Sequence, residues 1–300
     1  MVVPTPNTPP SSADAECVES VYARLQLHSG AFRAMGWRRR TTTHMKMTYR
    51  LLLASILGTF CSGMLPDGVA ASTTTTAGSD AFVTTGPASN LSNNNYGGGG
   101  ALAIAAGNLP NGEFQTVIQF GLSGARNSFD TQYGAGQWSI QTVSLQLSSS
   151  PHNNPVYNDV APGLFGISLL QNNSWMEGSG NASNPAGDGI TYNTLQNTFI
   201  NNAADQALGI FSFPGGTSGM NTYSLSLSSV LTADILAGND LSLRLFAADN
   251  TVSYLFSSRS ATLASSQPQL VITAVPEPGG LAVFGLGLGM LWWVGRRSNP

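Results

Sequence analysis

The chain has 300 residues, of which 42% are hydrophobic, only 9% are charged and 34 are glycine, whereas globular chains usually have about 25% charged residues. Its formal net charge is −3, and between residues 80 and 275 ten carboxylates stand against three arginines. This acidic balance excludes nucleic-acid binding, since displacing counterions from phosphates requires a basic surface. Both cysteines, Cys17 and Cys61, precede residue 72, which excludes disulfides, cysteine-ligated zinc and thiolate catalysis downstream of it.

An apolar segment near the N-terminus predicts export. Residues 51–65, LLLASILGTFCSGML, carry no charge and follow Lys46 and Arg50. A basic start, an apolar run and small residues before a cut between Ala71 and Ser72 are typical of a secretory signal peptide. The run is shorter than the ~20 residues that span a bilayer. We therefore expect a cleaved signal peptide, with an uncleaved anchor as the alternative.

The signal begins unusually far into the chain. Residues 1–44 show no apolar periodicity and are rich in Pro, Thr, Ser and Arg. Three methionines stand just before the apolar run: Met35, Met45 and Met47. We expect translation to begin at one of them, so that residues 1–44 are a misassigned or disordered extension and 45–71 the signal peptide; a genuine long basic region is the alternative.

Residues 72–275 are predicted to form an exported β domain, with a core over 80–274. Apolar and small polar residues alternate in short segments, and turn-forming residues separate them, which indicates strands with one solvated face. Strands are expected at 80–84, 101–105, 114–120, 139–147, 223–227, 241–246 and 269–274. About eight to ten strands with little helix predict an all-β, jelly-roll-like β-sandwich.

Two segments of this domain depart from the alternating pattern. Residues 229–236 predict a short helix that is capped by Ser228 or Ser229 and ended by Gly238. Residues 194–207 are compatible with another helical piece or a long loop.

The last 25 residues combine three features in order. The tripeptide Pro276–Pro278, Pro-Glu-Pro, precedes an uncharged apolar run, Gly279–Gly295, and two arginines follow the run. The arginines are expected on the cytoplasmic side of a short membrane-spanning helix, as the positive-inside rule predicts.

These three features together resemble the PEP-CTERM sorting signal of Gram-negative exopolysaccharide producers. In that family, an exosortase, which is an integral-membrane cysteine protease, recognises and cuts the signal. The resemblance implies that residues 276–300 are a sorting signal whose helix spans the membrane transiently. The implied sorting residues are Pro276, Glu277 and Pro278 in the motif, and Arg296 and Arg297 in the basic tail. A permanent C-terminal anchor is the alternative.

Short motifs inside the domain resemble DNRLRE-type carbohydrate-binding β-sandwich domains. They are Asp80–Val83, Asn95–Gly97, Phe114–Ser123 with a Leu-Ser turn at its end, Trp175–Gly178 and Gly189–Asn193. The sequence departs from the family in a long spacer between Glu177 and Thr191, and in Tyr192 where the family usually has Trp. The resemblance implies a β-sandwich and makes Trp175 and Tyr192 candidate carbohydrate contacts; a role in the core is the alternative.

Catalytic patterns are scarce. The sequence has no GxSxG, HExxH, P-loop or dinucleotide motif, and His152 lies by itself in a turn composition. Glycoside hydrolysis usually needs two carboxylates, and Glu177 beside Trp175 is the most attractive acid. Its alternative role is that of a loop carboxylate fixing the turn. We therefore predict a non-enzyme without cofactor.

Calcium is the one metal that the sequence leaves open. Five aspartates lie in Asn- and Gly-rich loops and could supply the oxygen ligands that hard cations prefer. They are Asp130, Asp159, Asp188, Asp205 and Asp249. Their spacing matches no known ligand set, and turn formation is the alternative role.

The sequence predicts an exported, non-catalytic protein of the cell surface or extracellular matrix, held in the membrane transiently by its C-terminus. Its expected partners are signal peptidase, an exosortase-type membrane protease and exopolysaccharide or biofilm material, among which it would have a structural or adhesive role. Affinity for carbohydrate is what the DNRLRE resemblance implies. The alternatives are a surface polysaccharide hydrolase or lyase that uses Glu177, and a permanently membrane-anchored surface protein.

Overall fold

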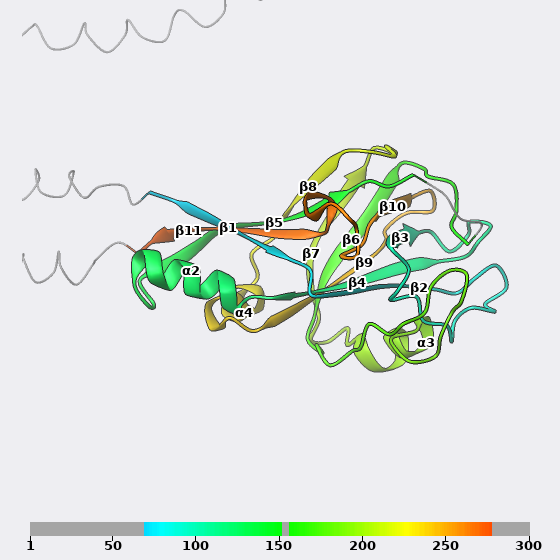
Figure 1. The fold of residues 1–300 in the computed structure, drawn as a ribbon, viewed down its shortest axis with the longest axis horizontal. Helices are drawn as coiled ribbons and strands as arrows, with labels where there is room; N and C mark the ends of the chain where they lie inside the picture. The colour runs from blue at the N-terminus through cyan, green and yellow to red at the C-terminus, as the bar shows by residue number, and fades with distance from the viewer. Residues whose placement is uncertain (1–68, 152–155, 278–300) are drawn as a thin grey trace, which may run out of the picture. The chain divides into compact units, whose positions relative to one another are not determined.

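The computed structural model describes residues 69–151 and 156–277, which form two antiparallel β-sheets with few helices (Figure 1). One sheet has the strand order β1 (Ala71–Thr76), β11 (Gln269–Pro276), β5 (Trp138–Ser148), β8 (Met220–Leu225). The other has the order β10 (Ser253–Ser257), β3 (Ala101–Ala105), β4 (Phe114–Gly121), β9 (Asp240–Ala247), β6 (Gly163–Leu170), β7 (Gln206–Phe213), and β2 (Ser79–Thr84) pairs with β4. The predicted all-β fold is thus confirmed.

Every strand expected from alternation is present, although β8 ends two residues earlier than predicted, at Leu225. Four further strands, β1, β6, β7 and β10, were not predicted from the sequence. β6 has the sequence GLFGISLL, whose last six residues are all buried, so apolar residues occupy both faces and no alternation appears. β1, ASTTTT, has almost no apolar side chains to alternate.

The helix predicted over 229–236 is confirmed as α4 (Ser229–Ala237). The Ser228 hydroxyl accepts the Leu231 amide hydrogen bond at 3.1 Å, and Gly238 ends the helix with a left-handed φ of 70°. The turn expected at Leu122–Ser123 is instead the beginning of α2 (Ser123–Tyr133), whose polar composition hid it. Residues 194–207, expected to form a helical piece or a long loop, include the π-helical turn η2 (Leu195–Phe199), which directly follows the short helix α3 (Tyr192–Thr194). A 3₁₀ turn, η3, covers Ala264–Ser266.

Two clusters of buried side chains form the core. The larger cluster lies between the sheets and includes Phe82, Phe114, Phe165 and Tyr254. The smaller cluster lies on the other face of β2 and β4. Its members are Ala81, Val83, Val117, Leu170, Trp175, Ile190 and Leu195. Alternate residues of β2 therefore enter different clusters, and the segment after β6 covers the second one.

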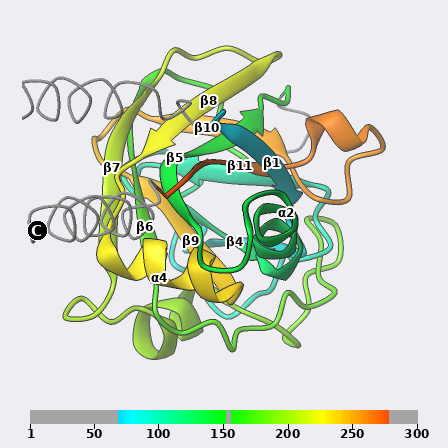
Figure 2. The ribbon, with the colours of Figure 1, turned by 90° about the vertical axis from the view of Figure 1, so that its left-hand side faces the viewer.

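The first and last described strands are neighbours. β1 pairs with β11 from Ala71 opposite Ala274 to Thr76 opposite Gln269. Helices α2 and α4 lie at the same end of the domain, which Figure 2 views directly. Within the described ranges, no helix has the length and apolarity needed to cross a membrane; the apolar runs at 51–65 and 279–295 lie outside those ranges.

Candidate functional site

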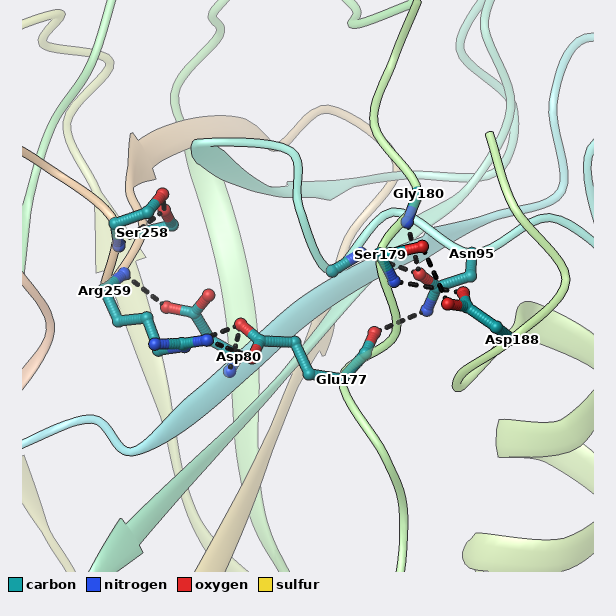
Figure 3. A network of polar contacts seen from close by, with 10 residues as sticks. Asp80, Asn95, Glu177, Ser179, Gly180, Asp188, Ser258 and Arg259 are labelled. Atoms are coloured by element: carbon teal, nitrogen blue, oxygen red, sulfur yellow. Dashed lines mark hydrogen bonds and ion pairs between the residues drawn. The ribbon is translucent and has the colours of Figure 1, made fainter. Parts of the chain in front are cut away.

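Three motifs that are far apart in the sequence meet at one place beside β2: Figure 3 shows Asn95 beside Glu177, and Asn95 also bonds the carbonyl oxygen of Ile190. They are the Asn-Tyr-Gly motif at 95–97, the Trp-x-Glu-Gly motif at 175–178, and the segment at 189–193. The loop after β10 joins them through Arg259. The site contains two polar centres, one around Asn95 and one around Asp80.

The Asn95 centre is fully hydrogen-bonded. The side-chain amide nitrogen donates to the carbonyl oxygens of Glu177 at 2.6 Å and Ile190 at 2.8 Å. Its oxygen accepts from the backbone amides of Gly97 and Gly180, each at 3.1 Å. Asn95 is completely buried, and these bonds use all the donors and acceptors of its side-chain amide. One side chain thereby ties three chain segments together.

Glycines surround Asn95 because there is no room for larger residues. Gly178 has a φ of 77°, and a Cβ there would overlap the side-chain oxygen of Asn95. A Cβ on Gly97 would overlap the carbonyl oxygen of Glu177. The glycines of both motifs are thus explained by close packing.

The Asp80 centre contains two carboxylates and one arginine. The Arg259 guanidinium donates to both carboxylate oxygens of Glu177, with Nε at 2.7 Å from Oε1. The backbone amide of Arg259 donates to Asp80 Oδ2 at 2.6 Å, and the Asp80 amide donates to Glu177 Oε1 at 3.3 Å. These bonds connect β2, the loop after β6 and the loop after β10.

Asp80 is the least well compensated member of this centre. It is only 1% exposed, and its Oδ1 is buried without a hydrogen-bond partner among the described residues. Burial, and to a smaller extent the negative charge of Glu177, raise the pKa of Asp80 to about 7; the Arg259 amide bond and guanidinium charge oppose the shift. Asp80 is therefore only partly ionised near neutral pH.

The hydrolase alternative needs Glu177 and a second acid, and the structure does bring Asp80 next to Glu177. However, Arg259 occupies both carboxylate oxygens of Glu177, and Asp80 is buried. Neither Asp80 nor Glu177 lines the depression beside Met176 or the depression beside Trp138 in the described part of the domain. The three residues connect β2 and two loops to one another, which agrees with the alternative role of Glu177 as a carboxylate that fixes a turn.

The two candidate carbohydrate contacts differ in exposure. Trp175 is 5% exposed, and its indole donates to Ser242 Oγ at 2.9 Å inside the second core cluster. This placement favours the core alternative for Trp175. Tyr192 is half-buried at the edge of that cluster and donates to Glu113 Oε2 at 2.7 Å. Burial raises the pKa of the Tyr192 hydroxyl.

The aspartates considered for calcium bind neighbouring backbone or side-chain groups. Asp249 accepts the amides of Leu164, Thr251 and Val252, and Asp205 those of Gln171 and Asn201. Asp188 accepts the Ser179 amide and hydroxyl, and Asp130 accepts the Trp138 indole. These are turn- and helix-fixing contacts, and within 69–151 and 156–277 no group of three or more His, Cys, Asp or Glu side chains could hold a metal ion. Asp159 also has a partner.

The predicted processing sites lie at the β1–β11 end. Ala71 and Ser72 are the first residues of β1, and Ser72 Oγ lies 2.8 Å from Thr273 Oγ1. Pro276 ends β11 opposite Trp138, while Glu277 is exposed. Pro278, Arg296 and Arg297 lie outside the described residues.

Neither Asp80 nor Arg259 was predicted from the sequence as a partner of Glu177. The only signal was indirect: Arg259 is one of three arginines in an otherwise cation-poor domain. Its ion-pair partner is 82 residues away in the sequence, so no local pattern links them.

Comparison with known protein families gives no matching family model, and comparison with curated proteins gives no match. The similarities to PEP-CTERM signals and DNRLRE-type domains therefore remain predictions that depend on the short motifs that carry them.

Proposed function

We propose that this chain is an exported, non-catalytic protein of the cell surface or extracellular matrix, released from a transient membrane anchor by an exosortase-type protease. The observation that carries the proposal is the pairing of β1 with β11. It brings the two predicted processing sites to the same end of one sheet.

The register of this pair supports the proposal in detail. Ala71, the last residue of the predicted signal peptide, lies opposite Ala274, two residues before the Pro-Glu-Pro motif. The two predicted processing sites therefore lie close together at one end of the β1–β11 pair. A cut after Ala71 would keep Ser72 opposite Thr273 and the rest of the β1–β11 ladder.

The strand pairing also supports a jelly roll as the finer description of the fold. Eight strands form nested antiparallel pairs: β1 with β11, β4 with β9, β5 with β8, and β6 with β7. In a jelly roll, one long antiparallel hairpin folds over into two four-stranded sheets, so its strands pair in this nested way. β2, β3 and β10 are additions to the sheet that contains β4.

A structural rather than catalytic role is supported by the engagement of both domain glutamates. Glu177 is held by Arg259, and Glu113 accepts from Tyr192 and Gln115. The association with exopolysaccharide, and carbohydrate binding by the domain, are proposed from the two sequence resemblances.

The test is the intact mass of the protein recovered from its native host. We expect a chain that begins at Ser72 and lacks Arg296 and Arg297. Glu277→Gln in the motif should leave the C-terminus uncut, whereas the matched control Glu177→Gln should be processed normally. A wild-type chain that retains Arg296 and Arg297 would contradict the proposal and leave a permanently anchored surface protein.

A further inference from the structure

The end of β11 belongs to the folded sheet up to the sorting motif itself. β11 lies between β1 and β5, and its pairing with β5 continues through Val275 opposite Ser139 to Pro276 opposite Trp138. One residue further, the Glu277 amide donates to the Gln137 carbonyl oxygen at 2.9 Å. The strand ladder therefore includes the first residue of the Pro-Glu-Pro motif, and the backbone bonding extends to the second.

These last residues also support buried side chains of the domain. Trp138, opposite Pro276, is 2% exposed and packs against Phe129 with a ring-centroid distance of 4.9 Å. The Tyr133 hydroxyl lies 3.3 Å from the Ala274 carbonyl oxygen. Removal of residues 274–276 would therefore uncover part of the core at this end.

A protease usually binds its substrate as an extended segment whose backbone groups pair with the enzyme. The backbone of residues 269–276 already pairs with β5, and that of 269–274 also with β1. Opening this pairing would sacrifice ladder hydrogen bonds and buried contacts. By contrast, Glu277 is exposed and borders an open depression of about 220 Å³.

We infer that the sorting protease cuts on the C-terminal side of Glu277, so that the domain is released with β11 whole. This inference rests on the proposed function, and it identifies the part of the sorting signal that stays with the product. Only Pro278 separates Glu277 from the apolar run at Gly279, so the cut falls between the folded sheet and the predicted membrane segment. The reaction is hydrolysis of one backbone amide: its C–N bond breaks, the oxygen of water adds to the carbonyl carbon, and the departing nitrogen takes the proton.

The rival route is separation of the strand tip before cleavage. The register of β11 on β5 shifts between Thr273 and Ala274, so residues 274–276 form a short ladder beyond an irregularity. If this tip had to separate from β5, the cut could fall at or before Pro276. A cross-link that closes the tip distinguishes the two routes.

The chain offers two matched positions for such a cross-link. Val275 and Ser139 are opposite each other beyond the irregularity, and Val271 and Ser144 are opposite each other before it. All four are partly exposed, and antiparallel partners lie close enough for a disulfide. Val275→Cys with Ser139→Cys is the test variant, and Val271→Cys with Ser144→Cys is the control. The natural cysteines precede the predicted mature start, so each product would hold one designed pair.

The full-length variants are produced in the native host, and the fraction cut and the C-terminal residue are determined by intact and C-terminal-peptide mass. We expect the tip cross-link to leave the fraction cut unchanged within about twofold of the control, and the product to end at Glu277 or Pro278. The inference is overturned if the tip cross-link alone blocks processing, if the product ends at Pro276 or earlier, or if it ends beyond Pro278. If wild type is never cut, the proposed function fails and the inference fails with it, which distinguishes that result from the other two.

Discussion

The two polar centres beside β2 share the loop that contains Glu177 but differ in how completely their buried groups are hydrogen-bonded. Around Asn95, every donor and acceptor of a neutral amide has a backbone partner. Around Asp80, a buried carboxylate has one oxygen bonded to Arg259 and the other without a partner in the described structure. The first centre joins chain segments at no electrostatic cost, whereas the second introduces a charge that burial disfavours.

This difference predicts opposite responses to substitution. Removing the Asn95 side-chain amide should leave backbone carbonyl and amide groups without a hydrogen-bond partner, because that side chain is the partner they have. Neutralising Asp80 should instead raise the free energy of unfolding at neutral pH, because it removes the penalty of burying a charged carboxylate. Substitutions in the two centres test that contrast.

Asn95→Ala should lower the free energy of unfolding by about 4 kcal/mol or more, because it removes the side-chain partner of two carbonyl oxygens and two amides, and the bonds with the Ile190 carbonyl and the Gly180 amide are buried. Urea unfolding of the exported domain measures the change. The matched control is Asn93→Ala, since Asn93 is exposed and should contribute only about 0.5 kcal/mol. Equal losses for the two variants would show that the Asn95 centre does not have the importance assigned to it.

Gly178→Ala should lower the free energy of unfolding by about 3 kcal/mol. The substitution adds a Cβ at a left-handed φ of 77° and forces it against the Asn95 side chain. A Cβ added at Gly187 would meet no heavy atom within 4 Å, and the φ of Gly187 is not left-handed, so Gly187→Ala is the control. Thermal unfolding should distinguish the variants, and a Gly178→Ala domain as stable as the control would contradict the close packing at Asn95.

The same contrast shows what the sequence can and cannot predict. Alternation predicted the half-buried strands, and the cap residues Ser228 and Gly238 predicted α4, because both signals act over a few residues. β6 escaped notice because both of its faces are buried. At the site, the motifs containing Asn95 and Glu177 were recognisable, but their bonds join residues 82 or more positions apart. The order of the strands in the sheets decides which distant groups meet. No short stretch of a single sequence reveals that order.

Stability should depend on pH through Asp80. Its pKa is about 7 in the folded state against an ordinary 3.8, so the folded protein binds this proton more tightly than the unfolded chain. The contribution is therefore fully present below about pH 4 and is lost as pH rises to about 7. The full shift corresponds to about 4 kcal/mol. Local relaxation and water penetration reduce the penalty for a buried charge, so we expect a loss of about 2 kcal/mol.

Asp80→Asn tests this prediction. The variant should flatten the pH dependence between about 4.5 and 7, and at about pH 8 it should be more stable than wild type by about 2 kcal/mol. Asp188→Asn is the control of opposite sign, because hydrogen bonds from Ser179 lower the pKa of Asp188. Its contribution is present above the ordinary pKa and is lost as pH falls, so the variant should not change the slope above about pH 4.5. If Asp80→Asn were less stable than wild type at about pH 8, the Asp80 carboxylate would stabilise the fold, and the contrast between the two centres would be wrong.

Glu177→Gln should have the smallest effect, lowering the free energy of unfolding by about 1 kcal/mol or less, since the Arg259 side chain is 41% exposed and solvent screens the pair. Its diagnostic effect is on Asp80: the Glu177 charge raises the pKa of Asp80, so its removal should move the loss of stability to lower pH. Glu113→Gln is the matched control, because its contacts are to Tyr192 and Gln115, and it should leave that transition in place. If Glu177→Gln left the transition unmoved, the two carboxylates would not interact, and the raised pKa of Asp80 would come from burial alone, opposed by Arg259.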